Sequence, residues 1–148
     1  MRRLALALVL CGCAAAPELP QAPIPLRNPA APVASQADVT QGRLGGDWVV
    51  VQGAGLTPGA RLRFSDGAMS LDGVNMPLAE TGPGRYAVGG QTLWIHWLDA
   101  DNRTAAVGDP GGARVWIMDR TGRPGERLTA AREILEWYGY DLRRLDGS

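Results

Sequence analysis

The chain contains no lysine at all, and it has only one histidine and two cysteines among its 148 residues. Cys11 and Cys13 both stand near the N-terminus, so neither a disulfide framework nor a cysteine-based metal site is expected in the rest of the chain. The single His96 cannot form a zinc site without several carboxylates arranged around it. The 15 basic residues are all arginines, they are scattered, and 15 acidic residues balance them, which predicts no nucleic-acid partner.

Motifs of the common enzyme classes are missing as well. The sequence has no G-x-S-x-G element, no phosphate-binding loop and no paired-carboxylate signature. His96 with the nearby Asp99 and Asp101 is the one candidate for a catalytic base and its orienting partner. A lone histidine on a strand is more often a hydrogen-bonded structural residue. The sequence therefore predicts no enzyme, no cofactor and no metal.

Residues 1–12 are predicted to form a signal peptide, because two arginines precede an apolar run that is too short to span a bilayer. The run ends in L-C-G-C at residues 10–13, which resembles a bacterial lipobox. In such signals the last cysteine is lipidated, so Cys13 is expected to carry acyl chains that anchor the protein, at about 0.8 kcal/mol per buried CH₂. Ala14, rather than an aspartate, follows this cysteine and favours the outer membrane. The alternative is a plain secretory signal with an incidental cysteine.

Residues 13–42 are predicted to form a tether. They contain six prolines among alanine, glutamine and serine, and no apolar period is visible. Proline fixes φ and supplies no N–H, so this segment should be extended and semi-rigid, at about 3.1 Å per residue. Residues 43–148 are predicted to form one folded domain, since a chain of this length suffices for one domain and hardly for two.

The predicted domain is all-β, with one helix near its end. Turn residues recur every six to ten positions, and the runs between them favour strands. Leu62 and Phe64 alternate with Arg61 and Arg63, a period of two with one apolar face. These features predict a small up-and-down antiparallel barrel of about eight strands. The predicted strands cover residues 48–51, 61–64, 68–71, 75–79, 85–88, 92–98, 104–108 and 115–118.

One amphipathic helix is predicted after the last strand. Pro124 suits its first turn, and Gly139 suits the position just beyond its end. Apolar residues recur between them at steps of three and four, which gives one apolar stripe. The helix should therefore lie against the outside of the barrel. The stripe consists of Leu128, Ala131, Ile134, Leu135 and Tyr138.

Three short motifs, in this order, resemble those of bacterial lipocalins. Gly46-Asp47-Trp48 matches the G-x-W of the first strand, Arg120 in W-I-M-D-R closes the last strand, and G-Y-D-L follows the helix. In that family the arginine lies over the tryptophan and plugs the closed end, a cation–π contact that contributes about 0.5–2 kcal/mol. The resemblance covers roughly residues 44–145. The turn at residues 99–103, D-A-D-N-R, stands where bacterial members typically have D-x-x-Y-R, so Asn102 departs from the family's pattern. Val49 replaces the usual aromatic after the motif tryptophan, and the middle strands are short.

The resemblance implies a membrane-anchored protein of the bacterial envelope, facing the periplasm, that holds a small apolar ligand such as a fatty acid or lysophospholipid. An eight-stranded barrel can enclose one small ligand. Strand position makes five residues candidates for the ligand-binding wall. They are Phe64, Met69, Tyr86, Trp94 and Trp116.

The alternative is a ligand-free interaction module whose barrel is filled by its own side chains and which binds another envelope protein. Arg61, Arg63 and Arg114 are its candidate surface contacts. Space for a chain of several carbons would favour the carrier, whereas a filled interior would favour the module. The segment Leu26–Val39 is expected to pack across the closed end, as such leaders do in some lipocalins. The sequence leaves the ligand's identity, the oligomeric state and the choice of membrane open.

Overall fold

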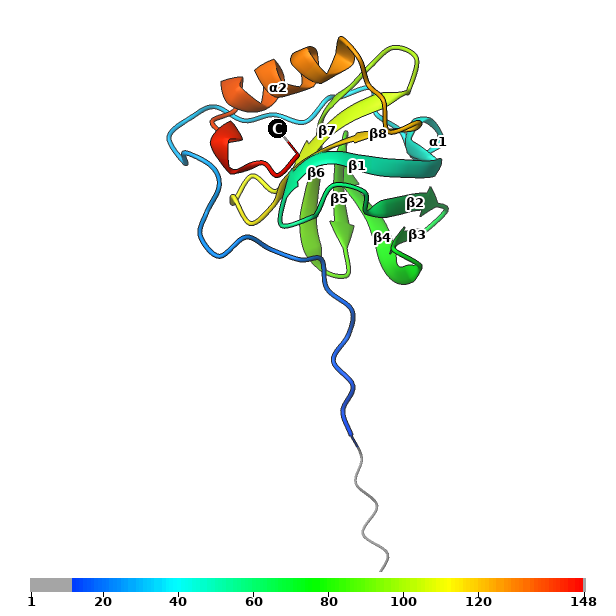
Figure 1. Ribbon diagram of the computed structural model, residues 1–148. Helices are drawn as coiled ribbons and strands as arrows, with labels where there is room; N and C mark the ends of the chain where they lie inside the picture. Colours follow the sequence, from blue (N-terminus) through cyan, green and yellow to red (C-terminus); the bar gives the residue numbers. More distant parts are fainter. Residues whose placement is uncertain (1–11, 148) are drawn as a thin grey trace, which may run out of the picture.

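The computed structural model describes residues 12–147, and its central feature is a closed barrel of eight antiparallel strands (Figure 1). Each strand pairs with the next, and β8 pairs with β1 to close the ring. The predicted all-β up-and-down barrel is confirmed. Most of the predicted signal peptide, residues 1–11, lies outside the described residues. The strands are β1 (Gly46–Ala54), β2 (Arg61–Ser65), β3 (Ala68–Leu71), β4 (Val74–Gly82), β5 (Arg85–Val88), β6 (Gln91–Leu98), β7 (Thr104–Gly108) and β8 (Val115–Asp119).

Side-chain alternation gives the barrel wall an inner and an outer face. On β2, Leu62 and Phe64 are buried, while the residues beside them are exposed, as a period of two requires. The pairing of β6 with β7 shifts register between Ile95 and Trp97. An extra residue at such a bulge changes which positions face inward, so Ile95 and Leu98 both belong to the interior core.

The helix α2 (Arg127–Trp137) lies against the outside of the barrel, mainly on β7, as Figure 1 shows. Its Ala131 and Leu135 are fully buried. Strands β7 and β8 are buried at every position, because the barrel interior packs on one face and α2 with the C-terminal segment packs on the other. The predicted helix is confirmed, and Gly139 follows it with a φ of 84° in the left-handed region.

Residues 19–39, which we call the strap, wrap around the barrel from one end to the other (Figure 1). The strap starts at the end formed by the β1–β2, β3–β4, β5–β6 and β7–β8 connections, which we call the mouth. It finishes at the opposite end, the base, where the short helix α1 (Gln41–Leu44) leads into β1. Thr40 caps α1, since its Oγ1 accepts a hydrogen bond from the N–H of Arg43.

The tether predicted over residues 13–42 is too long, because only residues 12–18 form a continuously exposed segment. From Leu19 onward the strap packs on the domain, with the N–H of Ala22 bonded to the carbonyl of Ala113 and that of Gln36 to the carbonyl of Ile95. The segment Leu26–Val39, expected to pack across the closed end, runs along the outer wall over most of its length and joins the interior cluster at the base only through Val39. A proline-rich composition does not predict such contacts, because they are made by isolated apolar residues and by backbone groups.

Candidate functional site

The candidate site is the interior of the barrel. Its lining is one continuous cluster of apolar side chains contributed by the barrel strands and joined by residues of the strap and α1. Four of the five predicted wall residues lie in this cluster, and each is at most 3 % exposed. These four are Phe64, Met69, Tyr86 and Trp116. Their placement makes the interior the site to consider, while ligand binding by them stays a prediction.

Trp94, the fifth predicted wall residue, was assigned to the wrong face. It lies between Leu93 and Ile95, both of which are fully buried in the interior cluster. Neighbouring side chains on a strand point to opposite faces, so Trp94 points outward. The guanidinium of Arg85 lies over its ring, with Cζ 4.0 Å from the ring centroid. Trp94 is therefore part of an outer-face cation–π pair and does not line the interior.

The interior is packed in this conformation. Trp48, Met69, Tyr86, Trp116 and Met118 are among the largest side chains that are fully buried. The two pockets described for residues 12–147 both lie on the outer surface of the molecule. Any molecule that enters the barrel must therefore displace side chains that fill it here.

The Tyr86 hydroxyl is the unusual polar group of this interior. It is buried and has no hydrogen-bond partner among the described residues, whereas the indole N–H groups of Trp48 and Trp116 bond to the Leu44 carbonyl and the Met118 sulfur. Burial, and secondarily the negative charge of Glu80, raise the pKa of Tyr86 to about 12. Tyr86 therefore stays protonated at neutral pH and carries a hydrogen-bond donor with no acceptor.

The base of the barrel is closed by Arg120. Its Cζ lies 3.7 Å from the centroid of the Trp48 ring, so the predicted stacking of this arginine on the motif tryptophan is confirmed. The guanidinium also donates to the carbonyls of Arg43, Gly45 and Asn102, at 2.9, 2.6 and 2.9 Å. One side chain thus satisfies three carbonyls from two loops and covers the end of the interior.

Gly46 belongs to the same closure for a steric reason. Its φ of 100° lies in the left-handed region, and a Cβ added there would stand 3.1 Å from Nη1 of Arg120. Residues Gly46, Trp48 and Arg120 therefore have the structural role that the motif resemblance implies. Asn102, which departs from the family's pattern, has a φ of 57° and accepts a hydrogen bond from Arg43 through its side chain.

The mouth is closed by the strap. Leu19 is 2 % exposed and belongs to the interior cluster although it comes from outside the barrel strands. Its N–H donates to Oε1 of Gln91 at 2.6 Å, and the next carbonyl, that of Pro20, accepts from Nε of Arg114 at 3.0 Å. Sequence reasoning missed Leu19, since one leucine among prolines gives no periodic signal.

His96 fastens the strap to the outer wall. Its Nδ1 lies 2.7 Å from the Ala34 carbonyl, and its Nε2 lies 2.7 Å from the Tyr140 hydroxyl. Burial, with a contribution from the positive charge of Arg27, lowers the pKa of His96 to about 4. The neutral ring therefore donates through Nδ1 to the strap and accepts through Nε2.

Asp99 and Asp101, the residues considered as partners of a catalytic histidine, pair with Arg127 instead, at 2.7 and 2.9 Å. Although burial opposes the shift, hydrogen bonds from the backbone of Thr104 and from Arg127 lower the pKa of Asp99. Within residues 12–147 no three His, Cys, Asp or Glu side chains converge in a way that could hold a metal.

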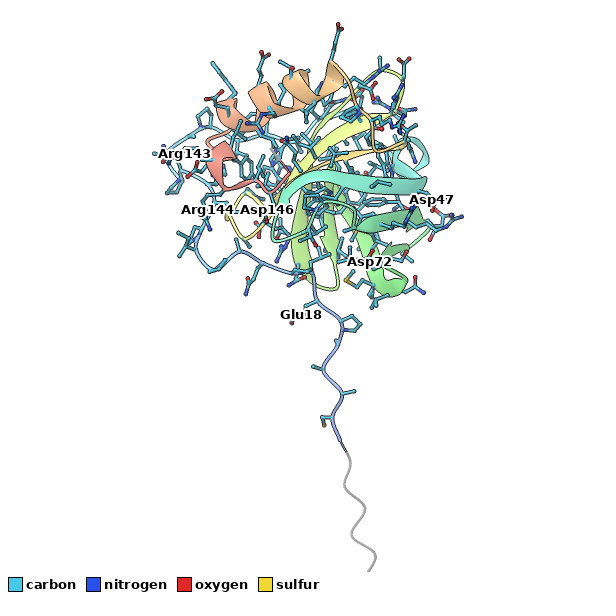
Figure 2. The ribbon with its side chains drawn as sticks, viewed as in Figure 1. Glu18, Asp47, Asp72, Arg143, Arg144 and Asp146 are labelled. Carbon is cyan, nitrogen blue, oxygen red and sulfur yellow. The ribbon has the colours of Figure 1, made fainter. Side chains whose placement is uncertain are left out.

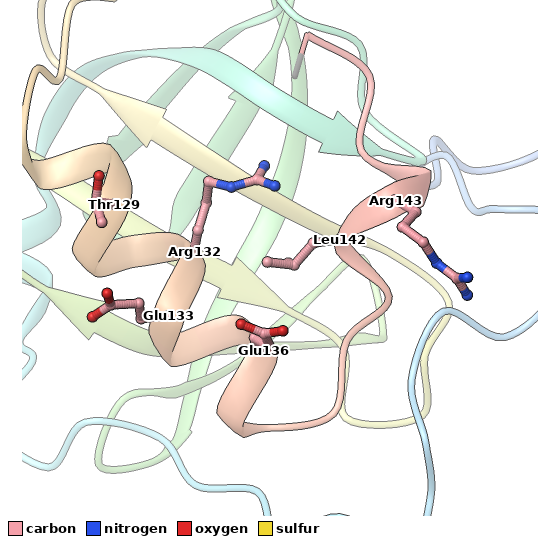
Figure 3. A pocket seen from close by; sticks show the side chains of 6 residues that line it. All are labelled: Thr129, Arg132, Glu133, Glu136, Leu142 and Arg143. Atoms are coloured by element: carbon pink, nitrogen blue, oxygen red, sulfur yellow. The ribbon is translucent and has the colours of Figure 1, made fainter.

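The larger outer pocket, about 470 Å³, lies between α2 and the 3₁₀ turn Leu142–Arg144 (Figure 3). Arg132 crosses it and donates to Oε1 of Gln52. The pocket is open and carries both charge signs, which does not suit an apolar ligand. Its lining residues are Thr129, Arg132, Glu133, Glu136, Leu142 and Arg143.

Of the candidate surface arginines, Arg61 and Arg63 are exposed on β2, and Arg63 pairs with Asp47 at 2.8 Å. Arg114 is 2 % exposed and bonds to the strap and to Asp109. It is therefore unavailable to a partner, and its assignment as a surface contact was wrong.

Cys13 is exposed near the start of the described chain, on the segment that leads into the mouth. Its lipidation stays a prediction. In the described part of the chain no helix is both long enough and apolar enough to cross a bilayer. No protein-family model matches the chain, and no curated protein matches it. The likeness to bacterial lipocalins is thus carried by the motifs quoted above.

Proposed function

We propose that this protein is a lipid-anchored, lipocalin-like binding protein of the bacterial envelope that takes up one single-chain apolar molecule, a fatty acid or a lysophospholipid. One observation carries the proposal: a closed barrel encloses an apolar core that contains the unpartnered hydroxyl of Tyr86. Leaving a buried polar group unpaired costs about 1–3 kcal/mol. A ligand with a hydrocarbon chain and one acceptor oxygen would fill the core and satisfy this donor.

Binding requires the packed interior to rearrange. Met69, Met76 and Met118 are all interior residues, and methionine side chains adapt to irregular spaces because they are unbranched and flexible. An acyl chain that buries about 300 Å² would gain about 7 kcal/mol at about 25 cal/mol per Å². This gain must exceed the free energy needed to move the side chains, so we expect moderate affinity.

The envelope location is supported by the N-terminal pattern and by the geometry around it. The lipobox-like run ends at Cys13, and residues 12–18 are exposed and lead to the mouth of the barrel. An anchor at Cys13 would hold the mouth close to a membrane surface. Ala14 favours the outer membrane, with the protein on its periplasmic side.

The direct test is a titration of delipidated protein, carrying Cys13→Ser, with fluorescent fatty acids and lysophospholipids. We expect saturable binding that an unlabelled fatty acid reverses. Tyr86→Phe should weaken binding about tenfold while leaving the ligand-free protein at least as stable, because it removes an unpaired buried hydroxyl. Trp94→Phe is the matched control on the outer face and should bind like the wild type. Absence of saturable binding to every lipid tested would overturn the proposal.

A second candidate, the ligand-free interaction module, is favoured by one specific observation. The interior is filled, and neither outer pocket enters it. If the module is correct, no lipid should bind, and Tyr86→Phe should raise stability without any other effect. The same titration therefore separates the two functions.

A further inference from the structure

We propose that Leu19 is a plug: it occupies the entry to the barrel interior at the mouth, and an acyl chain drawn from the anchoring membrane takes its place. This inference rests on the proposed function, because it assumes that the barrel binds such a chain. It adds the route of entry and the group that blocks it.

The first step is the position of Leu19. The rest of the interior is enclosed by the barrel strands, by Leu56 and Ala60 of the β1–β2 connection at the mouth, and by Val39, α1 and Arg120 at the base. Leu19 reaches the same interior cluster from a segment outside the barrel, and it is 2 % exposed there. Figure 2 shows Glu18, the residue just before it, where the chain meets the end of the barrel. An apolar side chain inserted from a separate segment can leave without breaking a strand pairing.

The second step is how the strap is held on either side of the plug. Before Leu19 the chain is exposed. After it, residues 21–25 line a surface hollow of about 250 Å³ together with residues 111–113, and Ile24 is 61 % exposed. Single hydrogen bonds hold the chain here: those of Leu19, Pro20 and Ala22 described above, and those that Arg144 donates to the carbonyls of Ile24 and Pro25.

The strap is fixed much more firmly a few residues further on. Arg27 donates to three carbonyls, those of Ala31, Pro110 and Tyr138. The N–H of Asn28 also donates to the carbonyl of Gly139. Residues 12–20 can therefore swing about Ala22 once two hydrogen bonds break, those of the Leu19 N–H and the Pro20 carbonyl, while the rest of the strap stays in place.

The third step concerns what lies outside the mouth. The β1–β2 connection, residues 55–60, and the β5–β6 connection, residues 89–90, contain no charged residue. Val74, at the start of β4, and Ile24 are exposed apolar side chains at this end. Six residue steps separate Cys13 from Leu19, at most about 20 Å of extended chain. The other two mouth connections carry Asp72, Asp109 and Arg114. An anchor at Cys13 would thus place the uncharged part of the rim beside lipid, where an acyl chain can replace the leucine side chain with little change in polarity.

The test compares two leucines of the strap that are equally buried. Leu19→Ala removes the plug, whereas Leu26→Ala removes a leucine that packs outside the barrel. Uptake of a fluorescent fatty acid by the Cys13→Ser protein can be followed by stopped flow. We expect Leu19→Ala to accelerate binding and to lower the apparent Kd about tenfold, because the plugged state, which does not bind, is then no longer the dominant one. Leu26→Ala should leave both unchanged, and Leu19→Met should restore wild-type behaviour.

The outcomes separate the plug from the function. If wild type and Leu26→Ala bind but Leu19→Ala binds at the same rate and affinity, the plug is refuted and the binding function stands. If no variant binds, the proposed function itself fails. Near-ultraviolet circular dichroism of each variant shows whether it is folded. If Leu19→Ala does not fold, deletion of residues 14–20, which removes the plug together with the exposed chain before it, replaces it, and an unchanged uptake rate in that variant counts against the plug.

Discussion

The two ends of the barrel are closed in different ways. At the base, Arg120 stacks on Trp48 and bonds to three carbonyls, so the closure is polar, directional and built from residues next to the strands. At the mouth, Leu19 closes the interior by apolar contact, and Leu19 and Pro20 are each held by one hydrogen bond. A closure that combines charge-assisted hydrogen bonds with stacking is costly to open, whereas an apolar plug exchanges with any other apolar group.

The largest expected effect compares a tryptophan in the barrel interior with one on the outer face of the barrel wall. Trp48→Ala should lower the free energy of unfolding by about 3–5 kcal/mol, because it leaves a cavity under Arg120. Trp94→Ala, on the outer face, should cost only about 1–2 kcal/mol, because the half-buried ring loses its cation–π pair and part of its packing. Urea denaturation of both variants measures this difference. Equal costs would contradict the assignment of the two tryptophans to opposite faces of the wall.

The second effect probes the polar closure of the base. Arg120→Ala leaves three carbonyls without their donor and should cost about 3 kcal/mol. Arg120→Lys keeps the charge but cannot match the planar fork, so it should recover only part of the loss. Denaturation midpoints of the two variants test this. A loss below about 1 kcal/mol for the alanine variant would mean that Arg120 covers the base without holding it.

The third effect is pH-dependent and concerns the fastening of the strap. The folded protein keeps His96 neutral down to a pKa of about 4, whereas the unfolded chain takes up the proton near 6.5. The contribution of His96 to the free energy of unfolding is therefore complete above pH 6.5, and it decreases by about 2–3 kcal/mol as the pH drops toward 4. Unfolding measured between pH 7 and 4.5 should show this slope in the wild type.

His96→Gln supplies the control for that slope. Glutamine does not titrate, so its stability should stay nearly flat between pH 6.5 and 4.5. The lowered pKa of Asp99 and of Asp119 stabilises the fold above the usual carboxyl pKa of 3.8. That stabilisation is lost only as the pH falls through 3.8 and below. An identical slope in wild type and His96→Gln would contradict the assignment of this titration to His96.

The smallest expected difference is between a buried leucine at the base and one at the mouth. Leu44→Ala, at the base, should cost about 3 kcal/mol because its fully buried site cannot collapse. Leu19→Ala, at the mouth, should cost only about 1–2 kcal/mol because the start of the strap can readjust. Thermal unfolding of the pair gives the comparison. A greater loss at Leu19 than at Leu44 would make the mouth the firmer closure.

The sequence predicted the base far better than the mouth. Gly46, Trp48 and Arg120 belong to short motifs, and the resemblance of these motifs to those of bacterial lipocalins implied that the three lie together. The eight strands and the helix carried periodic signals that the barrel retains. Leu19 sits alone among prolines, and its role depends on where the strap crosses the barrel, which no local pattern encodes.

Two further misassignments have physical causes. Trp94 points outward because its neighbours Leu93 and Ile95 both face the interior, and the bulge after Ile95 brings Leu98 inward as well. Arg114 was read as an exposed charge, whereas the strap covers it and uses it as a hydrogen-bond donor. The first misassignment concerns which face of the strand is inward, and the second depends on a contact from a distant part of the chain.

The most direct test of the account is a structure of the protein with a bound single-chain fatty acid. We predict that the acyl chain enters through the mouth, that it takes the place of Leu19, and that the stacking of Arg120 on Trp48 is unchanged. An acyl chain on the outer surface, or one that enters beside Arg120 while Leu19 stays in place, would contradict it.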